Sequence, residues 1–483
     1  MEMKRIELLC LTLLTVMNLS AKIKLPSVLG DNMVLQRSAS VNLWGWATPH
    51  RYVKVKPSWG KQTYKVKSGS GGNWIVRIST PEAGGPYSIE ISDGEPLTIK
   101  DILIGEVWIC SGQSNMEMPM HGFYGQPVEG TLEDIADAAQ YPGIRMFTVS
   151  PSPKADIQED CMGGWKKSDS GSVRDFSAVA YLFGKNLNKI LGIPIGLITS
   201  NCGGTPIEAW MTVDAIKQTA GINHERSLTH INDWESTTPS YLYNGMIAPL
   251  IQYTSRGFIW YQGETNQNNS ADYDKLMASM VKLWREKWEN MDMPFYYVQL
   301  APFTFDGANS IRLPLTIEAQ YKALRLIPNS AIASTTDLGH PTAIHPPRKK
   351  EIGLRLASIA LRNTYKTEAP LADAPVIDNV RYEGNKAILT FKNVPGYSPA
   401  AVGSFNYYVG ELKGFELAGQ DRKFYRAKAN HVTNQNKIEV TCEQVPNPVS
   451  VRYAFRNFSD ANVMTTEGLP LAPFRTDNWD DSF

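Results

Sequence analysis

The sequence carries no excess charge of either sign, because 48 lysines and arginines balance 48 aspartates and glutamates over 483 residues. A protein that holds nucleic acid or an anionic membrane surface needs a basic excess or a basic cluster. We therefore expect no nucleic acid and no polybasic membrane contact among its partners. The length exceeds that of one typical core and predicts two or three domains.

Cysteine is scarce, with five residues in the whole chain. The four that follow the N-terminal segment are Cys110, Cys161, Cys202 and Cys442. Four thiols in a chain of this size do not form a disulfide framework. None stands in a C-x-x-C or Cys/His spacing, which argues against a zinc site. We expect small buried apolar side chains, and a single disulfide stays open as an alternative.

Long apolar runs are also missing beyond the N-terminus. The first five residues are basic overall, residues 6–19 are apolar, and Ser20 and Ala21 are small. This pattern predicts a secretory signal peptide over 1–21, since the run is shorter than the ~20 residues of a membrane span. Cys10 lies inside the apolar run, which argues against a lipoprotein anchor. We expect a secreted or periplasmic protein with no membrane anchor.

Helical periodicity is absent from residues 22–100, where short alternating stretches at 41–46, 74–78 and 87–91 are separated by Gly, Pro, Ser and Asp. This pattern predicts an N-terminal β-sandwich-like domain. From residue 101 to 366, apolar strands alternate with amphipathic helices, which predicts an α/β core whose parallel sheet is covered on both faces. From 367 to 483 strand patterns return and predict a C-terminal β-rich domain.

Within the α/β core we expect elements at positions set by the apolar pattern. The expected strands cover 107–109, 195–199, 257–261, 295–300 and 331–335, and the expected helices cover 176–191, 273–288, 317–326 and 349–362. Residues 205–240 show no regular period and predict a loop-rich insertion. Ligands of such sheets bind beyond the carboxyl ends of the strands, so the segments that follow the strands are the candidate site.

The first of these segments, 111–116, places Ser114 in a strand-to-helix turn beside glycine. A serine there can present its hydroxyl at the rim of the sheet, and the first amides of the helix can stabilise an oxyanion. The alternative is a Ser/Asn helix cap, which these residue types equally favour.

Two further segments could complete such a site. Gly203 and Gly204 follow the strand at 195–199 and can expose backbone amides, although a simple tight turn is the alternative. Gln262 follows the strand at 257–261 and has a side-chain amide suited to an oxyanion. Glu264 close by could start a helix or give the site polar support.

The fourth segment holds Asp337, His340 and His345, so two of only seven histidines fall in it. A histidine can activate a serine at neutral pH because its unperturbed pKa is ~6.5. A single histidine is more often structural. One that stands with three other candidate turns at strand ends favours a serine hydrolase, which needs no metal or organic cofactor.

These segments resemble the SGNH hydrolase superfamily and, within it, the sialate O-acetylesterase-like carbohydrate esterases. The matching strings are GEVWICSGQSNM at 105–116, CGGTPIEAW at 202–210, WYQGETN at 260–266 and IHP at 344–346. Similar strings at 29–37 and 467–475 extend the resemblance over most of the chain. It implies an SGNH-type parallel sheet with helices on both faces and flanking β modules.

The resemblance also implies roles for particular residues. Ser114 would be the nucleophile and His345 its general base. The Ser114 amide, the amide of Gly204 rather than that of Gly203, and the Gln262 side chain would form the oxyanion hole.

One position departs from the superfamily pattern. The acid usually lies three residues before the histidine, and here that position is Thr342. Asp337 could supply the carboxylate from farther back, or a backbone carbonyl could orient His345 in a dyad.

The implied reaction removes acetyl groups from carbohydrates, with an O-acetylated sugar or glycan as substrate and O-acetylated sialic acid favoured. Acetylated xylan or xyloglucan is an alternative, as is a non-catalytic carbohydrate-binding module. A glycosidase built on Glu264 and Asp337 and a lipid or thioester hydrolase are further alternatives. Trp210, Trp234, Tyr261 and Glu264 are candidate substrate contacts, although core packing equally accounts for the aromatic ones.

Overall fold

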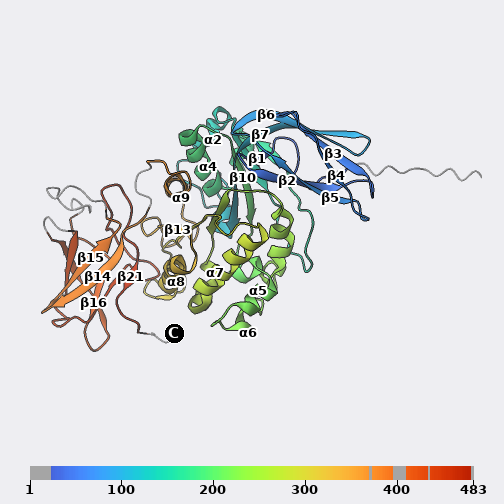
Figure 1. Cartoon of the computed structure of the whole chain (residues 1–483). Coiled ribbons are helices and arrows are strands. Elements are labelled where there is room, and N and C mark those ends of the chain that lie inside the picture. The colour runs from blue at the N-terminus through green and yellow to red at the C-terminus, as the bar shows by residue number, and fades with distance from the viewer. Residues whose placement is uncertain (1–22, 369–372, 395–409, 433–435, 480–483) are drawn as a thin grey trace, which may run out of the picture.

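The computed structural model describes residues 23–368, 373–394, 410–432 and 436–479. The predicted signal peptide at 1–21, with Cys10, lies outside the described residues. Three modules follow one another along the chain and lie in a row, with the α/β module between two β modules (Figure 1). The predicted fold class is confirmed by this arrangement.

The N-terminal module is built of short strands. They are β1 (Val34–Gln36), β2 (Ser40–Trp46), β3 (Tyr52–Pro57), β4 (Tyr64–Lys67), β5 (Asn73–Ser79) and β6 (Gly84–Ser92). β2 pairs with β5, and β3 pairs with β4 and β6, all antiparallel. The alternating burial along β3 explains why its sequence alternates between apolar and polar residues.

The strand that follows, β7 (Pro96–Gly112), joins two modules. Its first part pairs antiparallel with β6, and its second part pairs parallel with β10 and β11 of the central sheet. The boundary predicted at residue 100 therefore falls inside one continuous strand of 17 residues.

The central sheet runs in the order β13-β12-β11-β7-β10-β8-β9. All neighbours in this order are parallel except β8 and β9. Its remaining strands are β8 (Ile144–Thr148), β9 (Trp165–Lys167), β10 (Ile195–Asn201), β11 (Gly257–Tyr261), β12 (Phe295–Val298) and β13 (Ser330–Ala333). Their near-continuous burial is typical of parallel strands covered on both faces.

Nine α-helices lie within the described residues: α1 (Ser114–Glu117), α2 (Leu132–Ala136), α3 (Ser170–Arg174), α4 (Ala178–Leu191), α5 (Val213–Gln218), α6 (His224–Ser227), α7 (Ser270–Lys287), α8 (Arg312–Leu326) and α9 (Lys349–Asn363). Short 3₁₀ or π segments are η1 (Ala138–Gln140), η2 (Ile207–Trp210), η3 (Glu235–Thr237), η4 (Tyr243–Ile247), η5 (Ala248–Leu250) and η6 (Glu264–Asn269). α8 begins five residues before the expected start because Pro314 lies in its first turn, where a helix tolerates proline.

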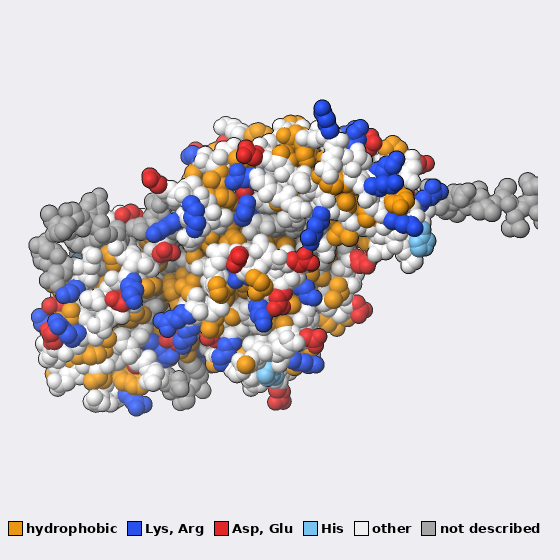
Figure 2. Space-filling view, viewed as in Figure 1, with side chains coloured by type: hydrophobic (Ala, Val, Ile, Leu, Met, Phe, Trp, Pro, Cys, Tyr) orange, Lys and Arg blue, Asp and Glu red, His pale blue; other side chains and the backbone are white. Residues whose placement is uncertain are grey.

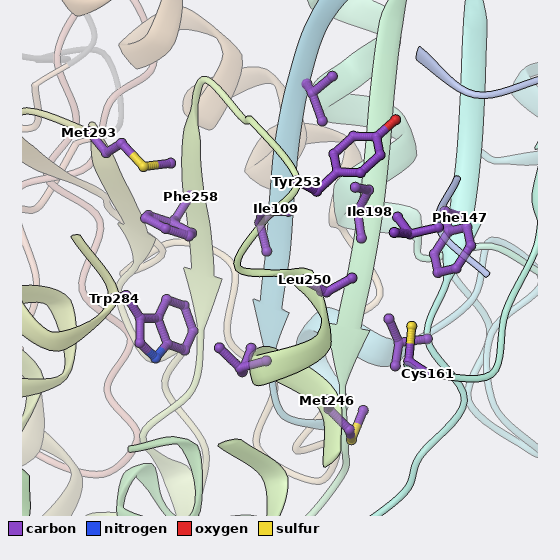
Figure 3. Packing of buried hydrophobic residues seen from close by; sticks show 14 of the residues in the cluster. Ile109, Phe147, Cys161, Ile198, Met246, Leu250, Tyr253, Phe258, Trp284 and Met293 are labelled. Atoms are coloured by element: carbon purple, nitrogen blue, oxygen red, sulfur yellow. The ribbon is translucent and has the colours of Figure 1, made fainter. Parts of the chain in front are cut away.

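Alternate residues of the central strands lie in two separate hydrophobic cores, one on each face of the sheet. Ile109, Phe258 and Trp260 pack with α7 on one face, in a cluster that continues into the N-terminal module. Trp108, Ile259 and Tyr261 pack with α4 and α9 on the other face. Figure 3 shows part of the first cluster, with Ile109 and Ile198 on neighbouring strands. Because side chains alternate across a strand, both faces of the sheet are packed against helices. This packing fixes the position of the carboxyl ends of the strands.

The C-terminal module contains two four-stranded antiparallel sheets, in the orders β14-β15-β19-β18 and β17-β16-β20-β21. Its strands are β14 (Val376–Glu383), β15 (Lys386–Lys392), β16 (Phe415–Ala418), β17 (Phe424–Arg426), β18 (Lys428–His431), β19 (Lys437–Thr441), β20 (Ser450–Tyr453) and β21 (Phe474–Arg475). A common apolar core fills the module. Arg475 ties it to α8 through a two-pronged ion pair with Glu318.

The surface matches the balanced composition, since acidic and basic side chains are interleaved over the face in Figure 2. Cys110, Cys161 and Cys442 are buried free thiols, and Cys202 is a half-buried free thiol. In the part of the chain that the structure describes, no helix has the length and apolar character needed to cross a membrane.

Candidate active site

The site lies where β7, β10 and β11 end. Ser114 is the first residue of α1, directly after β7. Gly112 makes this turn possible, because its φ is +144° and a Cβ there would lie 2.1 Å from the carbonyl oxygen of Tyr261. Only glycine allows the chain to turn so close to a neighbouring strand.

Ser114 and His345, more than two hundred residues apart in the chain, meet at this edge. The Oγ atom of Ser114 lies 2.8 Å from Nε2 of His345. Nδ1 of His345 lies 2.7 Å from Oε1 of Gln126. Because an amide oxygen can only accept a hydrogen bond, Nδ1 carries the proton and Nε2 accepts from the serine hydroxyl. The serine is thus set up to lose its proton to the imidazole.

Gln126 was not foreseen from the sequence. It lies in the turn between α1 and α2, where Gly122 and Gly125 both have positive φ. Phe123 of the same turn packs edge-on against the ring of His345, with 5.1 Å between the ring centroids. The two glycines could have indicated a tight turn, but no motif marks the glutamine.

Asp337 does not orient His345, which corrects one of the two alternatives for the third member of the site. Both of its carboxylate oxygens accept hydrogen bonds from Arg355, at 2.7 and 2.8 Å. Arg355 is a buried residue of α9, so the carboxylate neutralises a buried charge instead. The amide oxygen of Gln126 accepts the hydrogen bond from His345 that an acid accepts in the superfamily pattern.

The environment of His345 favours its neutral form. Burial, together with the positive charge of Lys349, lowers the pKa of its imidazole to about 4. Lys349 is itself buried, and burial lowers its pKa to about 7. A neutral imidazole is the form that can accept the serine proton.

Two backbone amides are suited to an oxyanion. The amide of Ser114 is at the start of α1, where amides have no acceptor within the helix. Gly203 lies against the nucleophile, since a Cβ there would be 3.3 Å from Cβ of Ser114. Its amide donates to the carboxylate of Glu117. The next amide, that of Gly204 with φ +71°, therefore remains the candidate from this turn.

Gln262 is not available as an oxyanion donor, contrary to the sequence-based expectation. It is fully buried, and its amide nitrogen donates to the carbonyl of Thr205 at 3.0 Å and to Oδ1 of Asn266 at 2.7 Å. Its amide oxygen accepts from Tyr273 at 2.9 Å. Both amide hydrogens are used, so Gln262 braces the Gly203-Gly204 turn against η6.

Glu264 supports the nucleophile through Asn115 and does not face a substrate. Its Oε1 accepts from Nδ2 of Asn115 at 2.6 Å. The same nitrogen lies 3.1 Å from the carbonyl of Ile344, and Oδ1 of Asn115 accepts from Lys349 at 2.6 Å. Asn115 follows Ser114 and Ile344 precedes His345, so this buried network ties the two catalytic segments together.

The aromatic candidates separate into buried and exposed ones. Trp210 and Tyr261 are fully buried and so do not contact a substrate at the surface. Trp210 packs edge-on against Trp260, and Tyr261 has the ammonium of Lys349 5.3 Å above its ring. Trp234, in contrast, is 63% exposed and lies beside Gly204, where a Cβ would be 3.2 Å from its ring.

Replacing Gln126 with alanine is expected to lower kcat about 10- to 100-fold, because the imidazole loses the hydrogen bond worth ~1.5–3 kcal/mol that orients it. Gln126→Glu should instead raise the pKa of His345, since a nearby carboxylate favours the imidazolium. The acid limb of the pH profile of kcat/KM should then move up from about pH 4. Gln140→Ala, at an exposed glutamine of η1, is the matched control.

An unaltered pH profile in Gln126→Glu, together with unaltered kcat in Gln126→Ala, would show that Gln126 does not position the imidazole. A purely structural role would change the melting temperature without moving the acid limb.

A parallel α/β sheet with a serine hydroxyl hydrogen-bonded to a histidine at its carboxyl edge is the arrangement of an SGNH-type serine esterase. Comparison with known proteins identifies the family within this class of esterases. The profile of the family described as "Carbohydrate esterase, sialic acid-specific acetylesterase" matches residues 104–362. The chain belongs to this family and is a carboxylic ester hydrolase of carbohydrates.

Relatives that match three quarters of the chain or more agree with the family. The human sialate O-acetylesterase is 30% identical over 398 residues, which cover 75% of this chain and 75% of the human protein. The mouse sialate O-acetylesterase is 28% identical, with 93% of each chain covered. A crystal structure of a carbohydrate acetylesterase from Xanthomonas citri superposes with a TM-score of 0.84 at 33% identity, covering 95% of this chain and 100% of that one.

Proposed function

We propose that this chain hydrolyses O-acetyl esters of sialic acid, with Ser114 as nucleophile and His345 as general base. The observation that carries the proposal is the 2.8 Å contact between Ser114 Oγ and His345 Nε2, in a chain related to sialate O-acetylesterases over three quarters of its length. The roles of these residues in turnover stay predictions.

The reaction would proceed by two acyl transfers. His345 takes the proton of Ser114 as Oγ attacks the acetyl carbonyl, and the amides of Ser114 and Gly204 stabilise the oxyanion. The imidazolium then returns its proton to the leaving sugar oxygen as the ester bond breaks. Water, deprotonated by His345, attacks the acetyl-enzyme, and acetate leaves as Ser114 regains its proton. Throughout, Gln126 accepts the hydrogen bond from Nδ1.

Another O-acetylated sugar is the second candidate substrate. The Xanthomonas citri structure, which is similar over 95% of this chain, is titled only as a carbohydrate acetylesterase. Acetylated xylan or xyloglucan would fit the same chemistry. A glycosidase is disfavoured, because the carboxylate of Glu264 is buried against Asn115 and both carboxylate oxygens of Asp337 are bonded to Arg355, so that neither group flanks a glycosidic bond.

Measuring the rate of acetate release from each candidate substrate distinguishes between these assignments. The purified chain is expected to release acetate from O-acetylated sialic acid with a higher kcat/KM than from acetylated xylan or xyloglucan, while glycosidic linkages stay intact. A preference for a polysaccharide would move the assignment to that substrate class. Sugar binding without any acetate release would contradict the esterase and favour a binding module.

We further propose that the protein is exported to the periplasm or secreted. The support is the basic start, the apolar run at 6–19 and the small residues Ser20 and Ala21. Export would place the enzyme where it meets glycans that carry acetylated sugars.

A further inference from the structure

Next to the turn that carries Gly204, the structure has a polar cavity of about 220 Å³ that the proposed reaction does not use. It lies between η6 and the segment Asn223–Thr237, which carries α6 and η3. Pro206, two residues after Gly204, lines it, as does Thr265. Oγ1 of Thr265 lies 3.5 Å from Oε1 of Gln113, the residue before Ser114. Two of its lining residues thus adjoin the segments that carry Gly204 and Ser114, which places the cavity within reach of a sugar whose acetyl ester lies at Ser114.

The chemistry of the walls fits a sugar. Glu208 holds the amide groups of Asn266 and Asn269, at 2.8 and 3.1 Å, and burial raises the pKa of its carboxyl group. Asn268 and Thr229 also line the cavity and are exposed, so an amide and a hydroxyl can reach sugar hydroxyls. Pockets that bind small polar ligands combine a few such groups with apolar surface.

Ile231 supplies apolar surface within the cavity, and Trp234 supplies it beside Gly204. Ile231 lines the cavity and is 55% exposed. The indole of Trp234, 63% exposed, lies over Gly204. An exposed aromatic ring beside a candidate oxyanion amide can stack against a pyranose ring while the acetyl group points to Ser114.

One wall of the cavity carries the positively charged side chain of Arg226. Arg226, in α6, lines the cavity and is exposed, and no described residue accepts a hydrogen bond or forms an ion pair with its guanidinium. Its backbone amide, in contrast, is fixed by the side chain of Asn223 at 3.0 Å, which anchors the helix that carries it. A planar guanidinium matches a carboxylate in geometry and charge.

We propose that Arg226 binds the carboxylate of an acidic sugar whose acetyl group is at Ser114, and that Trp234 stacks on the ring between them. This inference rests on the proposed function and deepens it, because it names the group that selects a sialic acid over a neutral acetylated sugar. Arg226 is then a specificity-determining residue and takes no part in acyl transfer.

The test compares one substrate in two charge states. Mono-O-acetylated N-acetylneuraminic acid and its methyl ester differ only in the carboxylate, and released acetate is measured for both with the full chain. Wild type is expected to favour the free acid, and Arg226→Gln should lower the ratio of the two kcat/KM values about tenfold or more, chiefly through KM, since hydrogen bonds to charged groups are worth ~1.5–3 kcal/mol.

Two variants serve as controls. Arg226→Lys should keep part of the preference, because lysine retains the charge without the planar fork. Arg325→Gln, at an exposed arginine of α8, should leave the ratio as in wild type. A wild-type ratio in Arg226→Gln would overturn the inference while the proposed function stands. No acetate release by wild type from either compound would instead show that the sialic acid assignment is wrong, and the inference would fall with it.

Discussion

Ser114→Ala is expected to lower kcat for acetate release by ~10⁴-fold or more while the protein stays folded. Loss of the nucleophile in a serine hydrolase removes nearly the whole covalent route, and only oxyanion binding and substrate positioning remain. Among the described residues the hydroxyl makes one hydrogen bond, with His345, so its removal should leave the melting temperature close to that of wild type. Acetate release and thermal unfolding on the same preparation measure both effects.

Ser170→Ala provides the matched control, since Ser170 is an exposed serine at the start of α3. It should retain wild-type kcat. Substantial activity in Ser114→Ala would place the nucleophile elsewhere and remove the basis for the proposed mechanism.

His345→Ala is expected to lower kcat by a comparable factor of ~10⁴ or more, because His345 is the group whose ring nitrogen accepts the hydrogen bond of the Ser114 hydroxyl. In wild type, kcat/KM should stay level from neutral pH down to about pH 4 and fall below it. Burial lowers the pKa of the imidazole to about 4, and only the neutral ring can take up a proton. The residual activity of the variant should lack this acid limb.

His340→Ala is the control from the same segment, since His340 is exposed and its Nδ1 lies 3.2 Å from the amide of Thr342. Its kcat and acid limb should match those of wild type. An acid limb that persists in His345→Ala would assign the titration to another group.

The place of the site could be predicted from the sequence because strand order did not have to be known. Parallel strands end at one edge of a sheet, so Ser114, Gly204 and His345, each after a strand, had to lie at the same edge. The helices at 178–191, 270–287 and 349–363 could also be predicted from the sequence, since each turns one apolar face to the sheet.

What the sequence could not give was which polar group bonds to which. Gln262 has the right side chain for an oxyanion, but its amide is used by Thr205 and Asn266 from other segments. Asp337 is near His345 in the chain, yet Arg355 of α9 takes its carboxylate. Gln126 lies in a turn without periodicity, and only the folded chain brings it to His345.

The continuous strand β7 has a consequence for how this enzyme can evolve or be engineered. Because the same strand pairs with β6 at one end and delivers Ser114 at the other, removing the N-terminal module would cut the hydrogen-bonded support of the nucleophile. The two regions should therefore melt together as one cooperative unit, and neither can be exchanged for a foreign module as a detachable part. The described strands of the C-terminal module form sheets of their own, and the module is joined to the α/β module by ion pairs such as Arg475 with Glu318 and by loop hydrogen bonds such as Phe303 with Asn457. Exchanging this module should therefore leave the strand pairing of the catalytic sheet intact.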